Sequence, residues 1–167
     1  ARLLFLAVYV TLTTTAHAQT VISDLNVPEG FIVERIADST LTAYPMFMEF
    51  DDEGNLFIAE STGKDLSGKE MVEDPECQIL RLVDNDGDGI YDERTIFATE
   101  LSLPMGILWH QGSLFVASPP EFLRFDDTDG DGVADHREVL HTGWNVFNTA
   151  SLHGPFLGPD GRLYLTH

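Results

Sequence analysis

Short β-rich runs alternate with turn-forming clusters along most of the chain, and no segment shows a convincing helical period. The runs are rich in aliphatic and aromatic side chains, and clusters of Gly, Pro, Asp or Asn separate them. The runs that we expect to be strands are 31–38, 46–51, 55–60, 78–84, 94–99, 113–118, 122–126, 137–142 and 162–167. This pattern predicts an all-β fold.

The chain also repeats itself. Residues 51–61, 109–119 and 157–167 each contain a turn glycine followed by a Leu-aromatic-aliphatic strand, and residues 80–99 superpose on 123–142 at an offset of 43 residues without a gap. A period of about 40–60 residues with about four short strands is typical of β-propeller blades. A β-sandwich is the alternative, but it gives no reason for strands and turns to repeat in the same order.

The length of the repeat region predicts a partial propeller. Residues 19–167 would form roughly three blades, whereas a propeller usually closes with about four to eight. We therefore interpret the sequence as the N-terminal part of a longer propeller. The run at 31–38 would then pair with the final blade and close the ring.

Composition narrows the classes of function. Hydrophobic residues make up 43% of the 167 residues, which is enough for a buried core. The formal net charge is −19, from 28 acidic and 9 basic residues, which argues against a nucleic-acid partner because no basic patch is available to replace phosphate counterions. Cys77 is the only cysteine in the sequence, so no internal disulfide and no CxxC metal or haem motif can form within it.

The N-terminus has the pattern of a secretory signal peptide over residues 1–18. Arg2 precedes an apolar run at 3–10, and small residues form an A-x-A pattern at 16–18, which predicts cleavage before Gln19. A short transmembrane anchor is the alternative, but an apolar run of about ten residues falls short of the ~20 that span a bilayer. Export to the periplasm, cell surface or medium would expose the protein to abundant calcium.

Two acidic loops have the spacing of EF-hand-type calcium loops, in which positions 1, 3, 5, 7, 9 and 12 supply oxygen ligands and position 6 is Gly. In the loop at 127–138 the predicted ligands are Asp127, Asp129, Asp131, the Val133 carbonyl, Asp135 and Glu138. In the loop at 84–95 they are Asp84, Asp86, Asp88, the Ile90 carbonyl and Asp92. Position 12 of this loop is Thr95, so we expect the site to be weaker, or to be completed by water and Glu93.

Two other interpretations of the loops are a metal-free acidic turn and a true EF-hand sensor. A sensor would need flanking helices, whereas β-like runs flank both loops. Several carboxylates held within a few Å without a cation would repel one another. We therefore predict calcium that clamps neighbouring strands and has a structural role.

Catalysis would require polar groups at one mouth of the propeller. The candidates are His110, His141, His153, His167, Arg81, Arg124 and Trp144. No HxxxH, HExxH or GxSxG motif surrounds any of the histidines. His153 is favoured as a catalytic residue because it lies in a predicted loop of small residues that leads into a strand.

The ordered motifs resemble a known family. The succession "GFIVERIAD", "FDDEGNLFIAES", "ILRLVDNDGDG", "LPMGILW", "DTDGDGVADHREVLHTG" and "LHGPFLGPDGRLYLTH" resembles the glucose/sorbosone dehydrogenase-like (soluble quinoprotein) β-propellers. It is most similar to the large exported membrane-bound dehydrogenase-type propellers of planctomycete-type bacteria, which often carry a cytochrome c domain. The resemblance covers nearly everything after residue 25.

The resemblance implies a six-bladed propeller that binds pyrroloquinoline quinone (PQQ) and calcium and oxidises a sugar or alcohol. A histidine takes the hydroxyl proton in that family, and its region matches that of His153, although the spacing to the following turn at Gly158 is shorter. The Arg and Lys residues that hold the quinone come from later blades, so we expect this part to be inactive alone. The alternative is a non-catalytic propeller module that binds glycans or proteins.

Overall fold

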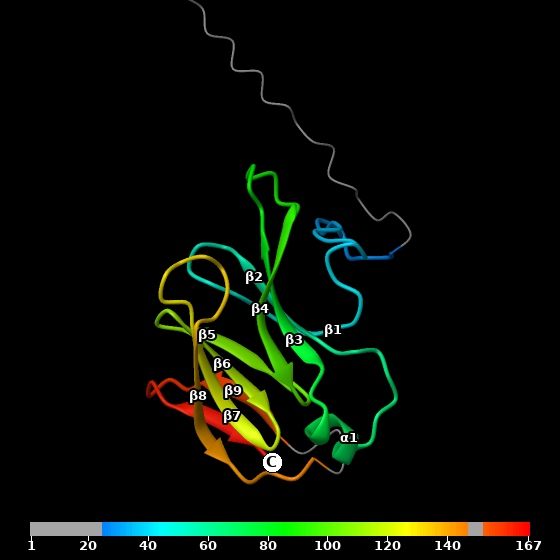
Figure 1. The fold of residues 1–167 in the computed structure, drawn as a ribbon. Coiled ribbons are helices and arrows are strands. Elements are labelled where there is room, and N and C mark those ends of the chain that lie inside the picture. The colour runs from blue at the N-terminus through cyan, green and yellow to red at the C-terminus, as the bar shows by residue number, and fades with distance from the viewer. Residues whose placement is uncertain (1–24, 147–151) are drawn as a thin grey trace, which may run out of the picture.

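The fold is all-β, which confirms that part of the predicted fold class. A computed structural model of the chain describes residues 25–146 and 152–167, and these residues form three antiparallel sheets, none of which is closed (Figure 1). The first sheet contains β1 (Pro45–Phe50), β2 (Leu56–Glu60), β3 (Cys77–Val83) and β4 (Glu93–Leu101). The second contains β5 (Ile107–His110), β6 (Ser113–Ser118), β7 (Glu121–Asp126) and β8 (His136–Thr142), and the third pairs β9 (His153–Leu157) with β10 (Leu163–Thr166).

Each strand pairs with the next one in the chain, so both four-stranded sheets are simple meanders. The sequence repeat is also a structural repeat, because β3–loop–β4 and β7–loop–β8 have the same pairing. A register shift occurs between Ile79 and Leu80 in the first sheet and between Phe122 and Leu123 in the second, at equivalent positions of the repeat.

The main hydrophobic core lies between the first and second sheets. It contains buried side chains from β2 to β7, among them Phe57, Phe97, Leu114 and Leu123. Phe57 packs edge-on against Phe97, with ring centroids 4.8 Å apart, and stacks on Trp109 at 5.3 Å. The opposite face of the first sheet forms a smaller cluster with Ala37 and Leu41. The first sheet is therefore covered on both faces.

The first strands of the three sheets lie side by side. Strand β1 contacts β5, and β5 contacts β9. The indole Nε1 of Trp109 on β5 donates a hydrogen bond to Asp52 of the β1–β2 turn, at 3.1 Å. At the start of β5, a Cβ on Gly106 would lie 2.0 Å from the carbonyl oxygen of Gly154 on β9, so glycine is required for this close approach.

The sheets have two distinct ends. At the first, which we call the loop end, the acidic loops 84–92 and 127–135 lie with the β1–β2 turn, and the hydroxyl of Tyr91 donates to the carbonyl of Gly54 at 2.9 Å. The starts of β5 and β9 lie at the other end, together with helix α1 (Gly68–Glu73), which we call the helix end. In Figure 1, loop 84–92 is at the top and α1 at the bottom.

Three expectations about local structure were wrong. Residues 31–38 form no strand, and only Glu34 makes an isolated bridge, because within the described chain this segment has no continuous strand as a partner. Helix α1 was missed, although "SGKE" at 67–70 is a capping-box sequence and Ser67 and Glu70 form that box. Strands β5 and β9 were not among the predicted runs, because they are short and contain few β-branched residues.

The predicted signal peptide, residues 1–18, lies outside the described residues. Among the residues that the structure describes, no helix has the length and apolar character needed to cross a membrane.

Candidate functional site

The two acidic loops share one hydrogen-bond pattern. Both carboxylate oxygens of Asp84 accept backbone N–H groups, from Gly87 at 2.7 Å and Gly89 at 2.8 Å. In the second loop Asp127 accepts from Gly130 and Gly132 at the same distances. The four glycines all have positive φ, from 76° to 88°, which L-residues rarely adopt. The glycines predicted at position 6, Gly89 and Gly132, therefore have the turn conformation that this position requires.

Each loop brings three carboxylates together, with one oxygen of each within 4.8 Å of the others. The first group is Asp84, Asp86 and Asp88, and the second is Asp127, Asp129 and Asp135. Positions 1 and 3 contribute in both loops, with position 5 in the first and position 9 in the second. Oxygen-rich groups of this kind have the chemistry that suits Ca²⁺.

The other predicted side-chain ligands lie outside these two groups. Asp92 accepts a hydrogen bond from the backbone N–H of Asn85 at 2.8 Å. Asp131 accepts from the backbone N–H of Val133, also at 2.8 Å. Glu138 lies on β8, where its carboxylate is 3.9 Å from the guanidinium of Arg124. The structure thus gathers three of the predicted carboxylates in each loop, and places Glu138 beside a cation.

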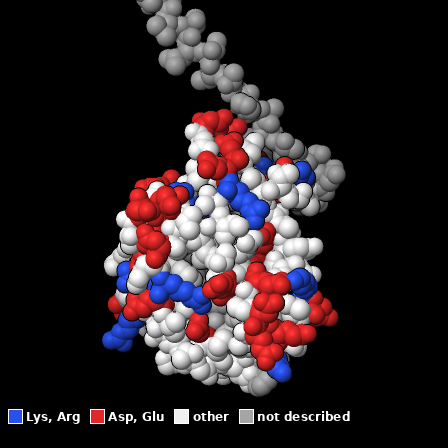
Figure 2. Space-filling view, viewed as in Figure 1, with Lys and Arg blue, Asp and Glu red and all other residues white. Residues whose placement is uncertain are grey.

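Each acidic loop gathers negative charge on the surface. Figure 2 shows red surface at the top and at the left, where Figure 1 places loops 84–92 and 127–135, and further red surface at the lower right, where Figure 1 places α1. Hydrogen bonds from backbone N–H groups, that of Gly89 first, lower the pKa of Asp84 against the opposing effect of burial. This carboxyl is therefore ionised at neutral pH and available to a cation.

Each loop also joins its sheet to a neighbouring segment. In the second loop the backbone N–H of Ala134 donates to the carbonyl of Phe97 on β4, at 2.8 Å. In the first loop the N–H of Tyr91, the equivalent residue, donates to the carbonyl of Ile36, also at 2.8 Å. The acidic loops therefore connect one structural unit to the one before it.

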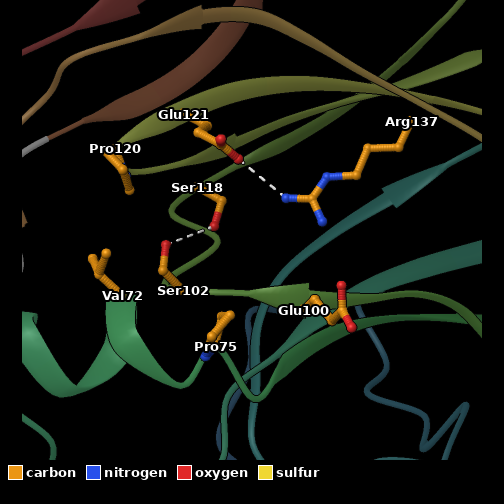
Figure 3. Close-up of a pocket in the computed structure, with 8 residues that line it drawn as sticks. All are labelled: Val72, Pro75, Glu100, Ser102, Ser118, Pro120, Glu121 and Arg137. Atoms are coloured by element: carbon orange, nitrogen blue, oxygen red, sulfur yellow. Dashed lines mark hydrogen bonds and ion pairs between the residues drawn. The ribbon is translucent and has the colours of Figure 1, made fainter.

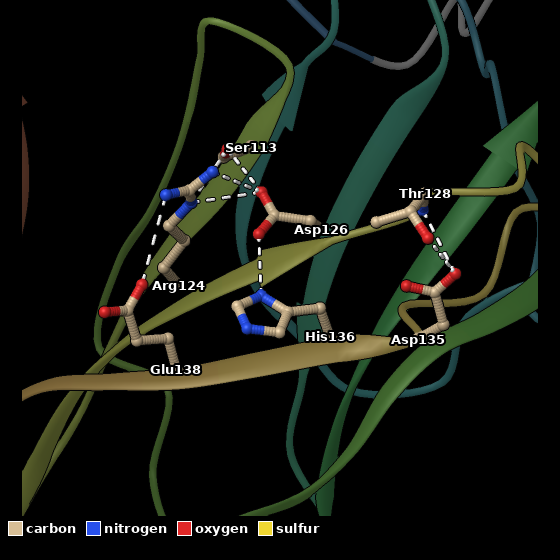
Figure 4. A network of polar contacts seen from close by, with 7 residues as sticks. All are labelled: Ser113, Arg124, Asp126, Thr128, Asp135, His136 and Glu138. Atoms are coloured by element: carbon tan, nitrogen blue, oxygen red, sulfur yellow. Dashed lines mark hydrogen bonds and ion pairs between the residues drawn. The ribbon is translucent and has the colours of Figure 1, made fainter.

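A polar network supports the base of the second loop (Figure 4). Asp126 accepts hydrogen bonds from Ser113 at 2.5 Å and from Arg124 Nε at 3.0 Å, and pairs with His136 Nδ1 at 2.9 Å. Burial raises the pKa of Asp126, but these partners outweigh it, so the pKa lies below the usual value. The first loop has Val83 at the equivalent position, so only the second loop is anchored in this way.

His153 lies at the helix end, away from the acidic loops. It is the first residue of β9 rather than part of a loop, and its side chain is half-buried. It lines a cavity of ≈ 400 Å³ formed by β1, β5 and β9. The other lining residues are mostly apolar and include Phe47, Met48 and Met105. Glu49 also lines the cavity, and burial raises the pKa of its carboxyl against a hydrogen bond from the backbone N–H of Trp109.

The remaining candidates do not converge on His153. His110 ends β5 at the loop end, and Arg124 belongs to the network of Asp126. Arg81 lies on β3 beneath the second loop, where a Cβ on Gly132 would be 3.0 Å from its guanidinium. His167 follows β10.

His141 and Trp144 form a separate pair near the helix end. Their ring centroids are 4.6 Å apart, with an edge-on arrangement. The sequence pointed to these residues but gave no signal that they would pair.

A polar cavity of ≈ 290 Å³ at the helix end was not expected from the sequence (Figure 3). Glu121 on β7 and Arg137 on β8 form an ion pair across it at 3.1 Å. The hydroxyls of Ser102 and Ser118 are 3.1 Å apart, and Ser102 also donates to the carbonyl of Pro119. The serine hydroxyls are occupied by these internal hydrogen bonds, so they serve the fold.

The cavity beside His153 does not fit PQQ by itself. PQQ carries several carboxylates and needs cationic partners, as anionic ligands generally do. Among the described residues that line the cavity there is one carboxylate, that of Glu49, and no Lys or Arg. This cavity therefore offers a proton acceptor in His153, but its described lining has no cation for the carboxylates of the quinone.

Comparison with known proteins gives one match. A family model described as "Domain of unknown function (DUF7133)" matches residues 17–167. The search of curated proteins found no match, and the search of solved structures found none either.

Proposed function

This chain belongs to the DUF7133 family, and we propose that it forms the N-terminal part of an exported, calcium-stabilised β-propeller of a sugar or alcohol dehydrogenase-like oxidoreductase. The observation that carries the proposal is the position of His153. It lies in the cavity between the first strands of three successive sheets, at the end opposite the acidic loops.

The arrangement of the sheets supports a propeller. In a propeller the first strand of each blade lines the central channel and the later strands lie progressively further out. Strands β1, β5 and β9 are in contact in this order, and each of the first two sheets continues outward in chain order. The cavity beside His153 would be one side of the channel.

The position of residues 31–38 supports closure of the ring by this segment. The backbone N–H of Ala134 donates a hydrogen bond to the carbonyl of Phe97 on β4, the fourth strand of the preceding sheet. The backbone N–H of Tyr91 donates to the carbonyl of Ile36 in the same way. Ile36 thus occupies the place of a fourth-strand residue of a neighbouring blade. The side chains of Phe31 and Ile32 are both 69% exposed, and inner strands of that blade would cover them.

Calcium in this proposal is structural. The two groups of carboxylates would hold one ion each, with Asp84 and Asp127 as the first ligands. Since both loops lie at the loop end, neither ion would reach a substrate beside His153. The ions would instead fix the loops that join neighbouring sheets.

The chemistry proposed for His153 is acceptance of a proton from a substrate hydroxyl. Oxidation of the alcohol to a carbonyl also removes a hydride from the carbon, and this hydride, with its two electrons, goes to an acceptor, which in the resembling family is a quinone. The described lining of this cavity has no Lys or Arg for the carboxylates of PQQ, so the role proposed for His153 is limited to the proton. A neutral imidazole is a suitable general base near pH 7.

Dye-linked oxidation tests the proposal. The whole protein is incubated with PQQ, Ca²⁺, dichlorophenolindophenol and a panel of aldoses and alcohols. Bleaching of the dye is expected, with a loss of about 10²–10⁴-fold in His153→Ala, as is usual for removal of a general base. His110→Ala, at the loop end, is the matched control and should keep the rate.

A specific observation favours a second candidate, a non-catalytic propeller module that binds glycans or proteins. The described cavity supplies no cation for the quinone, so binding without redox chemistry would need no further residues. Absence of bleaching across the whole panel, in protein shown to be folded, would refute the oxidoreductase proposal and favour the binding module.

A further inference from the structure

We propose that the cavity beside His153 binds a small organic ammonium compound with Glu49 as its countercharge, so that the substrate is an alcohol carrying an amine rather than a sugar. The inference rests on the proposed function, because it names the substrate class of the same site. The cavity of ≈ 400 Å³ lies within the range of about 300–1,000 Å³ typical of small-molecule sites. Its size admits many small molecules, so the class of ligand follows from the chemistry of its wall.

Glu49 places a carboxylate in this cavity without a cationic partner. The carboxylate accepts a hydrogen bond from the backbone N–H of Trp109, and burial raises its pKa, which indicates that part of its hydration is lost. Neither Lys nor Arg lines the cavity within the described chain, and His153 makes no ion pair with Glu49. A half-buried carboxylate is costly to keep charged unless a cation lies near it.

The basic residues of the described chain lie elsewhere. Arg81 lies beneath the second acidic loop, and Arg35 lines a different cavity, together with Tyr91 and Asp92. The others form ion pairs with carboxylates outside this cavity, and they are Lys64, Lys69, Arg94, Arg124, Arg137 and Arg162. The positive charge that Glu49 needs is therefore supplied by the ligand.

Aromatic and apolar side chains form most of the remaining wall. Phe47 on β1 and Phe156 on β9 both line the cavity, and they are 37% and 58% exposed. The face of an aromatic ring attracts a cation within about 6 Å of its centroid, and quaternary ammonium groups are recognised in this way. Met48 and Met105 add apolar surface for alkyl substituents. One carboxylate among apolar groups favours an alkylated ammonium over Ca²⁺, which takes about six to eight oxygen ligands.

The wall has too few polar side chains for a sugar. Among the described lining residues, the polar side chains are those of Glu49 and His153. A sugar has hydroxyls around its whole ring, and those that face apolar groups would lose their hydrogen bonds to water without replacement. An apolar body with one ammonium and one hydroxyl leaves no such group unpaired. The ammonium pairs with Glu49, and the hydroxyl donates to His153, which takes its proton while the hydride passes to the quinone-type acceptor.

The test compares three alcohols by calorimetry of the whole protein, without a redox acceptor. Choline carries a trimethylammonium group, its neutral isostere carries a tert-butyl group in the same place, and glucose is the sugar. Choline and the isostere have the same shape, so their difference in affinity reports the charge. We expect choline to bind about 10–100-fold more tightly than the isostere, as for a hydrogen bond or contact to a charged group. Glucose should show no saturable binding.

Methionine methyl groups labelled with ¹³C locate the binding by NMR. The resonances of Met48 and Met105 are assigned by their loss in Met48→Leu and Met105→Leu. Choline should shift both resonances saturably, because both residues line the cavity. The resonance of Met71, which lies on α1, should stay unchanged.

Glu49→Gln keeps the shape of the side chain and an acceptor oxygen for the N–H of Trp109, but it should abolish the preference for choline over the isostere. Glu53→Gln is the matched control, because it removes the same charge from an exposed position in the β1–β2 turn and should bind like the parent. Phe156→Leu, a change of an exposed side chain, should weaken choline binding about two- to fivefold.

The inference is overturned if the isostere or glucose binds as tightly as choline, or if Glu49→Gln keeps the preference while remaining folded. A shift of Met71 without shifts of Met48 and Met105 also overturns it. Failure here and failure of the proposed function are distinguishable. Dye bleaching with aldoses but no binding of choline would remove the ammonium site and leave the oxidoreductase. Binding of choline without bleaching by any alcohol would do the reverse.

Discussion

Replacement of Glu60 by Gln should destabilise the fold although the shape of the side chain is kept. Glu60 ends β2, and its carboxylate is only 7% exposed. It accepts hydrogen bonds from Ala43 N and Gln78 Nε2, both at 2.7 Å, and from Thr42 Oγ1 at 2.9 Å. The guanidinium of Arg94 lies 3.8 Å away. This one side chain therefore ties the segment before β1 to β2, β3 and β4.

The size of the destabilisation follows from the loss of the negative charge on residue 60. A hydrogen bond to a charged group contributes about 1.5–3 kcal/mol, but the three do not add, because Ala43 and Thr42 are partly exposed and regain water when the carboxylate is lost. Gln also turns an N–H₂ group toward at least one of the donors. We expect the free energy of unfolding to fall by about 2–3 kcal/mol, and the melting temperature by about 4–12 °C.

The assay is urea unfolding of both proteins as a function of pH. Burial acts to raise the pKa of Glu60, but the hydrogen bonds, first that from Ala43, lower it overall. A lowered folded-state pKa adds stability above the unfolded value of about 4.3, and this stability is lost as the pH falls through the folded-state pKa. The difference in free energy of unfolding between the parent and Glu60→Gln should therefore be largest at pH 7 and become smaller as the pH falls below the unfolded-state pKa.

Glu53→Gln is the matched control, because Glu53 is exposed in the β1–β2 turn. It should unfold like the parent at every pH. Equal stability of parent and Glu60→Gln at pH 7, or a difference that grows as the pH falls, would refute the reasoning.

Three further predictions concern other parts of the fold. At 10 mM Ca²⁺ and a dissociation constant of about 1 mM, one loop site should add about 1.4 kcal/mol to the free energy of unfolding. Differential scanning calorimetry should show this gain in the parent, and Asp127→Asn should lose the contribution of the second loop. A parent that melts identically in Ca²⁺ and in EGTA would contradict the prediction. Gly106→Ala should abolish cooperative melting, because its Cβ would lie 2.0 Å from the carbonyl oxygen of Gly154. Gly112→Ala has open space around the new Cβ but a φ of +80°, so it should lower the free energy of unfolding by only about 1 kcal/mol. Similar circular-dichroism melts for the two variants would be inconsistent with the packing of β5 on β9. Burial raises the pKa of the Cys77 thiol, so it should react with Ellman's reagent only after unfolding, and rapid reaction of the native protein would show that this part of the core is open.

The local features of this protein could be predicted from its sequence. Alternating runs such as 113–118 specify strands because period-2 hydrophobicity suits a sheet face. Glycine at 89 and 132, among evenly spaced aspartates, specifies the turn of each acidic loop because the backbone there needs a positive φ. The repeat at an offset of 43 residues is sufficient by itself to make the two loops equivalent. All of these depend on interactions between residues close together in the chain.

Only the tertiary structure determined which residues far apart in the chain are neighbours in space. In the structure His153 is the first residue of β9, Glu138 lies beside Arg124, and Trp144 lies opposite α1. The structure also separated the acidic loops from His153 by the length of the sheets, so the predicted metal sites and the predicted base do not form one centre. The sequence spacing of these residues carries no such information, because their relative positions depend on how the three sheets pack and on close contacts such as that of Gly106 with Gly154.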